Sequence, residues 1–213
     1  TNCVSASRAH QTGVLQHEVD DITLEGLRAE AADLGVWLSI GSLALKTGDP
    51  DGRFANRSFM INPKGDIVAR YDKIHMFDVD VSPTETYRES AGYRAGDRAV
   101  IAETPFGKVG LSICYDLRFA YLYRALAQAG ADILVVPSAF PPVTGAAHWQ
   151  TLLQARAIET GCFVLAAAQT GQHSVVAGKS RQTYGHSMVI SPWGEVLADA
   201  GVETGVEIID IDL

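Results

Sequence analysis

The sequence predicts an α/β fold in which two sheets lie face to face with helices on their outer sides. Two short runs, 109–113 and 132–137, are largely apolar, which is typical of buried parallel strands. A helical apolar pattern over 125–129, closed by Gly130, lies between them, and a crossover helix is the usual link between two parallel strands. Paired strand-like runs around turn residues, over 54–71 and 99–113, indicate hairpins in the same fold.

Length and composition bound the class of protein. The chain has 213 residues, 47% of them hydrophobic, so 1–213 is predicted to be a single domain with a sizeable core. The net charge of -8 argues against a nucleic-acid partner, because phosphates need basic side chains. The uncharged apolar runs are too short to cross a membrane. Three scattered cysteines (Cys3, Cys114 and Cys162) do not form a disulfide framework, and we expect a cytoplasmic location.

In the first half of the chain, 1–16 has no clear period and is predicted to be a loop. Apolar residues at helical spacing predict a helix over 20–34, capped by Asp20 or Asp21 and ended by Gly35. Strands are predicted at 36–40, at 43–45 after a turn, and at 54–61 and 67–71, the last two joined by a hairpin with Gly65 at its tip. A long irregular stretch follows to about 96.

In the second half, a helix is predicted over 148–160, with Leu152, Leu153, Ala157 and Ile158 facing inward and with Arg156 and Glu159 one turn apart. Strands are predicted at 163–168, at 187–190 with 196–198, and at 206–211, whereas 170–181 is predicted to be a polar loop.

Cys114 follows the first apolar strand, at the point where the helical segment begins. A side chain there lies at the carboxyl edge of the sheet, and the N–H groups of an opening helix lower a thiol pKa and stabilise a developing negative charge. This position suits a nucleophile. The alternative is a core cysteine, since free cysteine is among the most buried residue types.

The irregular stretch after the hairpin is rich in charged and titratable side chains. Long loops of this kind inside a compact domain are often functional, and the alternative is a solvated loop. The residues concerned are Lys73, His75, Asp78, Asp80, Glu85, Arg88 and Glu89.

Several motifs in one order carry a family resemblance. They are YDKIHMFD (71–78), YRES (87–90), GLSICYDLRF (110–119), PSAF (137–140), HW (148–149), ARAIE (155–159), YGHS (184–187) and PWG (192–194). Together they cover nearly the whole chain, which thereby resembles the nitrilase superfamily of carbon–nitrogen hydrolases. The resemblance implies an α-β-β-α four-layer sandwich, a homodimer, and a Glu–Lys–Cys triad that works without a metal or an organic cofactor.

The resemblance also implies residue roles. Cys114 matches the nucleophile, Lys73 the cation beside it, and Glu89 a second glutamate that holds the lysine. Lys73 and the backbone N–H of Tyr115 are then expected to stabilise the oxyanion of an amide under attack. No pair of Cys or His residues has metal-ligand spacing, so no metal site is expected.

One member of the triad has no match in the sequence. The general-base glutamate of the family closes an early strand after a proline, and nothing before Asp20 fits that pattern. We therefore expect the first strand and its helix, together with a short C-terminal tail, to be missing from the sequence given. An inactive protein of the same fold that acts as a binding module is the alternative.

Within the superfamily, the motifs resemble the deaminated glutathione amidase and ω-amidase branch. Its substrates are small 2-oxo acids with a terminal amide, and their carboxylate requires a cation. Arg118, one helical turn past Cys114, is the candidate, with a surface ion pair as its alternative. Phe140, His148 and Trp149 are candidates for the pocket lining, with core packing as the alternative for the two aromatic rings. Nitrile hydrolysis and N-carbamoyl cleavage remain alternative reactions.

Overall fold

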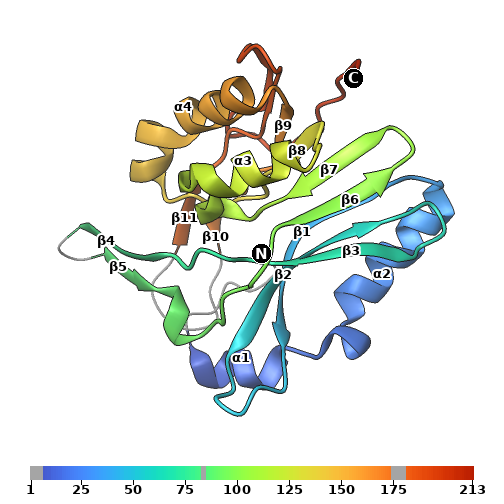
Figure 1. Ribbon diagram of the computed structural model, residues 1–213. Coiled ribbons are helices and arrows are strands. Elements are labelled where there is room, and N and C mark those ends of the chain that lie inside the picture. The colour runs from blue at the N-terminus through green and yellow to red at the C-terminus, as the bar shows by residue number, and fades with distance from the viewer. Residues whose placement is uncertain (1–6, 83–84, 174–180) are drawn as a thin grey trace. The chain divides into compact units, whose positions relative to one another are not determined.

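The computed structural model describes residues 7–82, 85–173 and 181–213 (Figure 1). These residues form two compact units. The first comprises 7–98, and the second comprises 99–173 with 181–213. Each unit contains its own sheet and its own helices.

The first unit is built on a three-stranded antiparallel sheet in the order β1-β2-β3. Its strands are β1 (Leu38–Lys46), β2 (Phe54–Ile61) and β3 (Ile67–Asp72). The helices are α1 (Arg8–Val14), η1 (Glu18–Asp20), α2 (Ile22–Leu34) and η2 (Glu89–Ala91), where η marks a short 3-10 helix. A hairpin of β4 (Asp78–Ser82) and β5 (Glu85–Arg88) completes the unit.

The predicted helix over 20–34 is confirmed as α2. Oδ1 of Asp21 accepts a hydrogen bond from the N–H of Leu24 at 2.8 Å, and Gly35 ends the helix with a φ of 64°. Leu24 and Ala31 pack into a cluster with sheet residues such as Phe59, so α2 covers one face of the sheet. The predicted hairpin of β2 and β3 is also confirmed, with Gly65 at a φ of 77°.

Three expectations for the first unit are wrong. Part of the predicted loop 1–16 is the helix α1, whose N-cap Ser7 accepts a hydrogen bond from the N–H of His10. The helix has no buried residue, so it leaves no apolar period in the sequence. The turn predicted at 41–42 is a register shift inside one continuous strand, β1. The stretch to 96 is not irregular throughout, because β4 and β5 pair within it.

The second unit contains a six-stranded sheet in the order β13-β12-β9-β8-β7-β6. Its strands are β6 (Val100–Thr104), β7 (Gly107–Leu111), β8 (Ile133–Val135), β9 (Phe163–Ala166), β12 (Met188–Ile190) and β13 (Val196–Asp199). The pair β7–β8 is parallel, as predicted, the pair β8–β9 is parallel too, and the other pairs are antiparallel. The remaining elements are η3 (Cys114–Arg118), α3 (Ala120–Gln128), α4 (Pro142–Thr160), and the hairpin of β10 (Thr170–His173) and β11 (Arg181–Tyr184).

Four expectations for the second unit need correction. The helix predicted from 148 begins earlier, at Pro142, which suits a first helical position. Ile158 does not face inward, because it is 61% exposed. The ends of the predicted polar loop 170–181 pair as β10 and β11, and 174–180 lies outside the described residues. The segment 206–211 is not a strand, and Val206 is 87% exposed.

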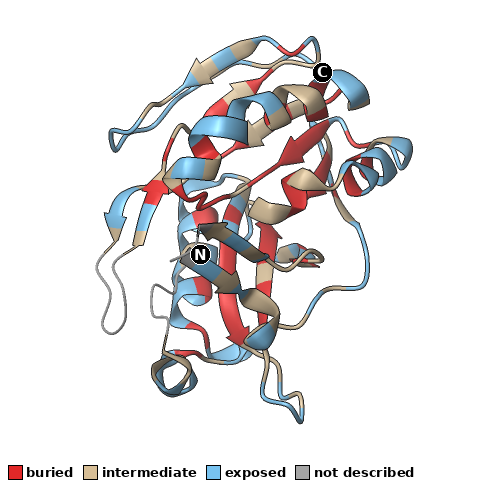
Figure 2. Cartoon of the chain, turned by 90° about the vertical axis from the view of Figure 1, so that its left-hand side faces the viewer, coloured by how far each residue is buried: buried red, intermediate tan, exposed pale blue. Residues whose placement is uncertain are grey.

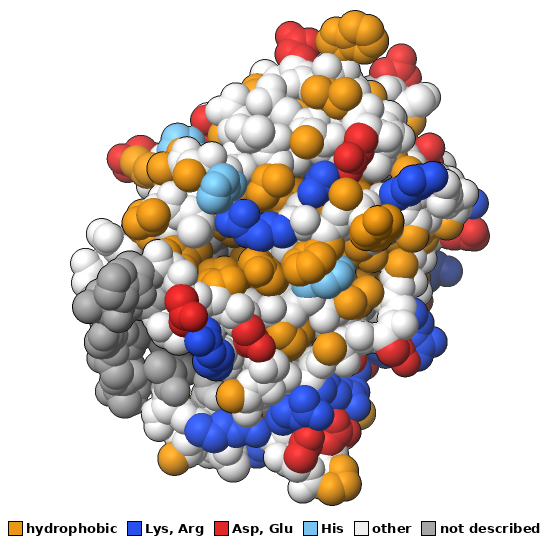
Figure 3. Space-filling view, turned by 60° about the vertical axis from the view of Figure 1, so that its left-hand side comes forward, with side chains coloured by type: hydrophobic (Ala, Val, Ile, Leu, Met, Phe, Trp, Pro, Cys, Tyr) orange, Lys and Arg blue, Asp and Glu red, His pale blue; other side chains and the backbone are white. Residues whose placement is uncertain are grey.

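Buried residues are concentrated on the strands and on one side of each longer helix (Figure 2). In Figure 1, α3 and α4 lie next to each other against the six-stranded sheet, and α4 contributes Trp149, Leu153 and Ala157 to the interior. Basic and acidic side chains lie interspersed on the face drawn in Figure 3. Within the described ranges, no helix is both long and apolar enough to span a membrane.

Candidate active site

The position of Lys73 follows from the pairing of β2 with β3. Arg57 pairs with Asp72, so the next position along the ladder brings Lys73 beside Asn56. The N–H of Lys73 donates to the carbonyl oxygen of Asn56 at 2.9 Å, and its own carbonyl accepts from the N–H of Gly96 at 2.8 Å. The Lys73 side chain is only 3% exposed. A buried ammonium group needs a close anionic partner, because leaving water is costly for an unpaired charge.

Glu89, the first residue of η2, supplies that partner. Its Oε2 accepts hydrogen bonds from Nζ of Lys73 and from the N–H of Phe77, the latter at 2.7 Å. Its Oε1 accepts a hydrogen bond from Nδ2 of Asn56 at 3.1 Å. The structure thus brings the two predicted residues Lys73 and Glu89 together as a buried ion pair, and it adds Asn56, which the sequence analysis missed.

A second charged pair lies next to the first. Asp72 accepts from Nε and Nη2 of Arg57 at 2.5 and 2.9 Å, and these hydrogen bonds raise the pKa of Arg57 above its ordinary value. Because side chains alternate along a strand, residues 57 and 72 point to one face of the sheet and residues 56 and 73 to the other. Lys73 therefore pairs with Glu89 and not with Asp72.

Cys114 lies in the second unit, three residues past the end of β7, where it opens η3. Its φ is 52°, in the left-handed region that side chains other than glycine rarely adopt. Its N–H donates to the carbonyl oxygen of Pro137 at 3.0 Å, which ties the turn to the segment after the parallel strand β8. The residue is partly exposed. Strained backbone of this kind is frequent where a reactive side chain is presented at a sheet edge.

Buried polar groups hold the turn that Cys114 opens. Oδ2 of Asp116, itself fully buried, accepts from the N–H of Ile113 at 2.9 Å. Nε of Arg156 on α4 donates to the carbonyl oxygen of Leu117 at 3.0 Å. The sequence analysis recognised Arg156 only as a partner of Glu159, because a contact with a backbone carbonyl 39 residues away leaves no local pattern.

Arg118 lies among the residues predicted to line the pocket. Its Nη2 is 3.2 Å from Nδ1 of His148, and its guanidinium carbon is 5.7 Å from the centre of the Phe140 ring and 5.9 Å from that of Tyr115. Such distances allow a cation–π interaction. In the described part of the chain Arg118 has no carboxylate partner, in contrast to the alternative of a surface ion pair.

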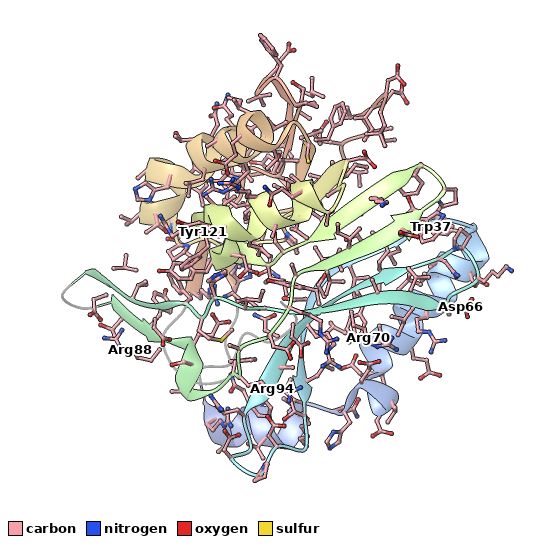
Figure 4. All side chains as sticks on the ribbon, viewed as in Figure 1. Trp37, Asp66, Arg70, Arg88, Arg94 and Tyr121 are labelled. Carbon is pink, nitrogen blue, oxygen red and sulfur yellow. The ribbon has the colours of Figure 1, made fainter. Side chains whose placement is uncertain are left out.

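Phe140 and Trp149 are buried, with exposed fractions of 5% and 1%. Their ring centres are 4.8 Å apart, and Nε1 of Trp149 donates to the carbonyl oxygen of His186 at 2.7 Å. Both rings are packed in the interior of the unit, and Phe140 is the one next to Arg118. Tyr121, labelled in Figure 4, is 86% exposed at the start of α3.

The candidate residues fall into two groups that are described within their own units. Lys73 and Glu89 belong to the first unit, and Cys114, Tyr115 and Arg118 belong to the second. Among the described residues, no three His, Cys, Asp or Glu side chains are grouped closely enough to hold a metal ion.

Comparison with known proteins decides the family. The model of the carbon-nitrogen hydrolase family matches residues 2–213. The chain belongs to the carbon-nitrogen hydrolase family. It is similar to the deaminated glutathione amidase of Yersinia enterocolitica, with 44% identity over 88% of this chain, and to that of Homo sapiens, with 44% identity over 89%. The chain spans 62% and 58% of the lengths of these two relatives.

Solved structures of family members confirm the predicted nitrilase-like α/β fold. The NitFhit protein of Caenorhabditis elegans matches 86% of this chain with a TM-score of 0.76 and 43% identity, and the chain covers 44% of it. An amidase mutant from Nesterenkonia sp. AN1, which is 25% identical, matches 94% of this chain with a TM-score of 0.74, and the chain covers 73% of it. That structure shows the product of Michael addition of acrylamide at its active-site cysteine. The predicted membership of the nitrilase superfamily is thereby confirmed.

Proposed function

We propose that this carbon-nitrogen hydrolase is an amidase that hydrolyses the terminal amide of a small 2-oxo acid through a thioester on Cys114. The observation that carries the proposal is the position of Cys114, a partly exposed thiol at the end of a parallel strand in left-handed backbone. The substrate class comes from the relatives, which are named deaminated glutathione amidases at 44% identity.

The first half of the reaction forms the thioester. The Cys114 thiolate attacks the amide carbonyl carbon, a C–S bond forms, and the carbonyl electron pair moves to oxygen. The ammonium of Lys73 and the N–H of Tyr115 stabilise this oxyanion, and one such donor is typically worth about 3 kcal/mol of barrier. When the carbonyl re-forms, the C–N bond breaks and the nitrogen takes up a proton and leaves as ammonia.

In the second half, water adds to the thioester, the C–S bond breaks, and the carboxylic acid, the Cys114 thiolate and one proton are released, which balances the proton taken up by the ammonia. The role proposed for Glu89 is to hold Lys73 in place. Both of its carboxylate oxygens already accept hydrogen bonds, and one of these comes from Nζ of Lys73. The roles of Lys73 and Glu89 in the same reaction as Cys114 rest on family membership. We propose no residue of 1–213 as the general base.

Arg118 is proposed to bind the carboxylate of the 2-oxo acid. Its guanidinium lies beside His148 and the Phe140 ring and has no carboxylate partner in the described residues, so an anionic ligand would complete its interactions. His148 is proposed to orient Arg118, and Phe140 and Trp149 to form the apolar floor beneath it.

The cellular location and the oligomeric state of the protein are also proposals. The scattered cysteines support a cytoplasmic location, and Cys162 is buried with its thiol directed at the carbonyl oxygen of Ala131. The resemblance to the superfamily supports a homodimer. Light scattering on the purified protein would give twice the monomer mass for a dimer, and the monomer mass would exclude it.

The test of the amidase function compares Cys114→Ala with Cys162→Ser. Ammonia release from 2-oxoglutaramate is measured, together with intact mass after brief exposure to iodoacetamide. We expect turnover and rapid labelling in the wild type and in Cys162→Ser, and neither in Cys114→Ala. Full ammonia release by Cys114→Ala would refute the proposal. Rapid labelling of Cys114 without turnover of any amide, nitrile or N-carbamoyl substrate would instead support an inactive protein of the same fold.

A further inference from the structure

Asn56 contacts both members of the buried Lys73–Glu89 pair. It lies on β2, the central strand of the three-stranded sheet, and is 6% exposed. Its side-chain Nδ2 donates to Oε1 of Glu89 at 3.1 Å. Its backbone carbonyl oxygen accepts from the N–H of Lys73 at 2.9 Å. The motifs that carry the family resemblance do not include this residue.

The orientation of the Asn56 amide follows from its partner. An ionised carboxylate only accepts hydrogen bonds, so the NH₂ group of Asn56 must face Glu89. This leaves Oδ1 of Asn56 buried without a hydrogen-bond partner in the described residues. A buried unsatisfied oxygen lowers stability, and an apolar side chain of similar size would avoid that cost but would leave Oε1 of Glu89 without its donor. These two effects on stability oppose each other, so stability by itself gives no strong reason for an asparagine at this position.

The hydrogen bond from Asn56 to Glu89 explains why an asparagine is useful at position 56. Oε2 of Glu89 already accepts from Lys73 and Phe77, whereas Asn56 is the only donor to Oε1 among the described side chains. The last torsion of a glutamate is broad, so the carboxylate plane can turn when one oxygen is left without a donor. A turned carboxylate would displace Nζ of Lys73, which sits at the end of a long flexible side chain.

We propose that Asn56 is a positioning residue of the amidase, which fixes the carboxylate plane of Glu89 and through it the ammonium of Lys73. This inference rests on the proposed function, because it assumes that Lys73 acts in catalysis. It adds a residue whose contribution is to the rate of the chemical step and not to the stability of the fold.

Asn56→Leu separates these two contributions. It removes the donor to Glu89 and also the unsatisfied oxygen. We expect kcat to fall about tenfold or more, KM to change by less than about twofold, and Tm to change little, because losing the donor to Glu89 and losing the unsatisfied oxygen have opposite effects on stability. A residue that only supports the fold would instead lower Tm, with kcat preserved in the folded fraction.

Asn56→Asp supplies a second readout, the pH profile. The charged groups around Glu89 in this unit are Lys73 and, on the neighbouring hairpin, Asp78 and Arg88. Two carboxylates about 3 Å apart repel each other, which raises the pKa of the pair above that of a single carboxyl group, so the pair takes up a proton as the pH falls. That proton restores a donor between residues 56 and 89. We expect the kcat deficit relative to wild type to shrink about fivefold or more from about pH 8 to about pH 6.

The chain offers a matched control for this charge change. Nδ2 of Asn62 lies 3.2 Å from Oδ2 of Asp66 at the tip of the β2–β3 hairpin. Asn62→Asp therefore introduces a carboxylate beside a carboxylate at the same spacing and in the same unit, away from Lys73. We expect its kcat to match that of the wild type at both pH values.

Two results would overturn the inference. One is Asn56→Leu with kcat within about twofold of the wild type, and the other is a kcat deficit of Asn56→Asp that does not change with pH. Should Asn56→Leu fail to fold, the pH profile of Asn56→Asp decides alone. Failure of the proposed function is distinguishable, because Cys114→Ala would then release ammonia. When Cys114→Ala is inactive and both Asn56 variants behave as wild type, only the role of Asn56 is refuted.

Discussion

Nε of Arg156 donates a hydrogen bond to the carbonyl oxygen of Leu117 at 3.0 Å, and this contact ties α4 to the turn that Cys114 opens. The Arg156 side chain is only 6% exposed. Its Nη1 bonds Oε1 of Glu159 at 2.7 Å, and its guanidinium carbon lies 5.4 Å from the centre of the Tyr123 ring. The buried guanidinium of Arg156 thus contacts a backbone carbonyl, a carboxylate and an aromatic ring. Through the first of these contacts, the turn after β7 is attached to α4.

Arg156→Lys tests this contact. Lysine keeps the charge but cannot reproduce the planar fork that reaches both Leu117 and Glu159, so we expect the free energy of unfolding to fall by about 1–3 kcal/mol. Urea denaturation monitored by fluorescence measures the loss. The control is Glu159→Gln, since the Glu159 side chain is 40% exposed and should matter by less than about 1 kcal/mol. Equal stability of Arg156→Lys and wild type would contradict the prediction.

Lys73→Met should destabilise the protein by about 3–5 kcal/mol, because Glu89 is left as a largely buried, uncompensated charge. The double variant Lys73→Met with Glu89→Gln should recover part of that loss. Urea denaturation of the single and double variants forms the cycle that measures the coupling. Arg88→Met is the matched control, because the Arg88–Asp80 pair is 52% and 65% exposed and should contribute less than about 1 kcal/mol (Figure 4). A coupling energy near zero between residues 73 and 89 would contradict the ion pair.

Gly145→Ala should lower Tm. A Cβ at this position of α4 would lie 2.3 Å from Cγ and 2.4 Å from Cβ of Tyr184, so α4 or β11 must move. The N–H of Tyr184 bonds the carbonyl oxygen of Phe140, and the shift would therefore reach the ring next to Arg118. Gly26→Ala in α2 meets nothing within 4 Å and should raise stability by about 0.5–1 kcal/mol. Thermal unfolding by calorimetry compares the two, and a higher Tm for Gly145→Ala would refute the predicted clash.

Arg118→Gln should raise KM for a 2-oxo amide that carries a carboxylate by about tenfold or more, with kcat little changed, because it removes a charged hydrogen-bond donor from the substrate. A neutral amide of the same length should show no such increase. Steady-state ammonia release with both substrates measures the difference. Arg124→Gln, an exposed arginine on α3, is the control. The same KM change with both amides would exclude Arg118 as the carboxylate-binding residue.

Local patterns predicted those elements whose signals lie within a short stretch of chain. The cap at Asp21, the apolar positions of α2 and Gly35 at its end are contiguous, so that helix was predictable. The helix α1 was not, because it has no buried side chain. Arg8 of α1 bonds the carbonyl oxygens of Gly52 and Gly92 and lies over the Phe54 ring, contacts that join segments far apart in the sequence.

The sequence alone determined the family of this protein and the place of Cys114 at the end of a strand, because both rest on contiguous motifs and on apolar runs. Only the tertiary structure decided how Lys73, Glu89 and Asn56 combine, since residues 73 and 89 are 16 positions apart and residues 56 and 89 are 33 apart. Such contacts depend on the register of β2 with β3 and on the path of the chain from β3 to η2, where Glu89 lies. A hydrogen bond between distant residues forms only when packing and strand register bring donor and acceptor within about 3 Å.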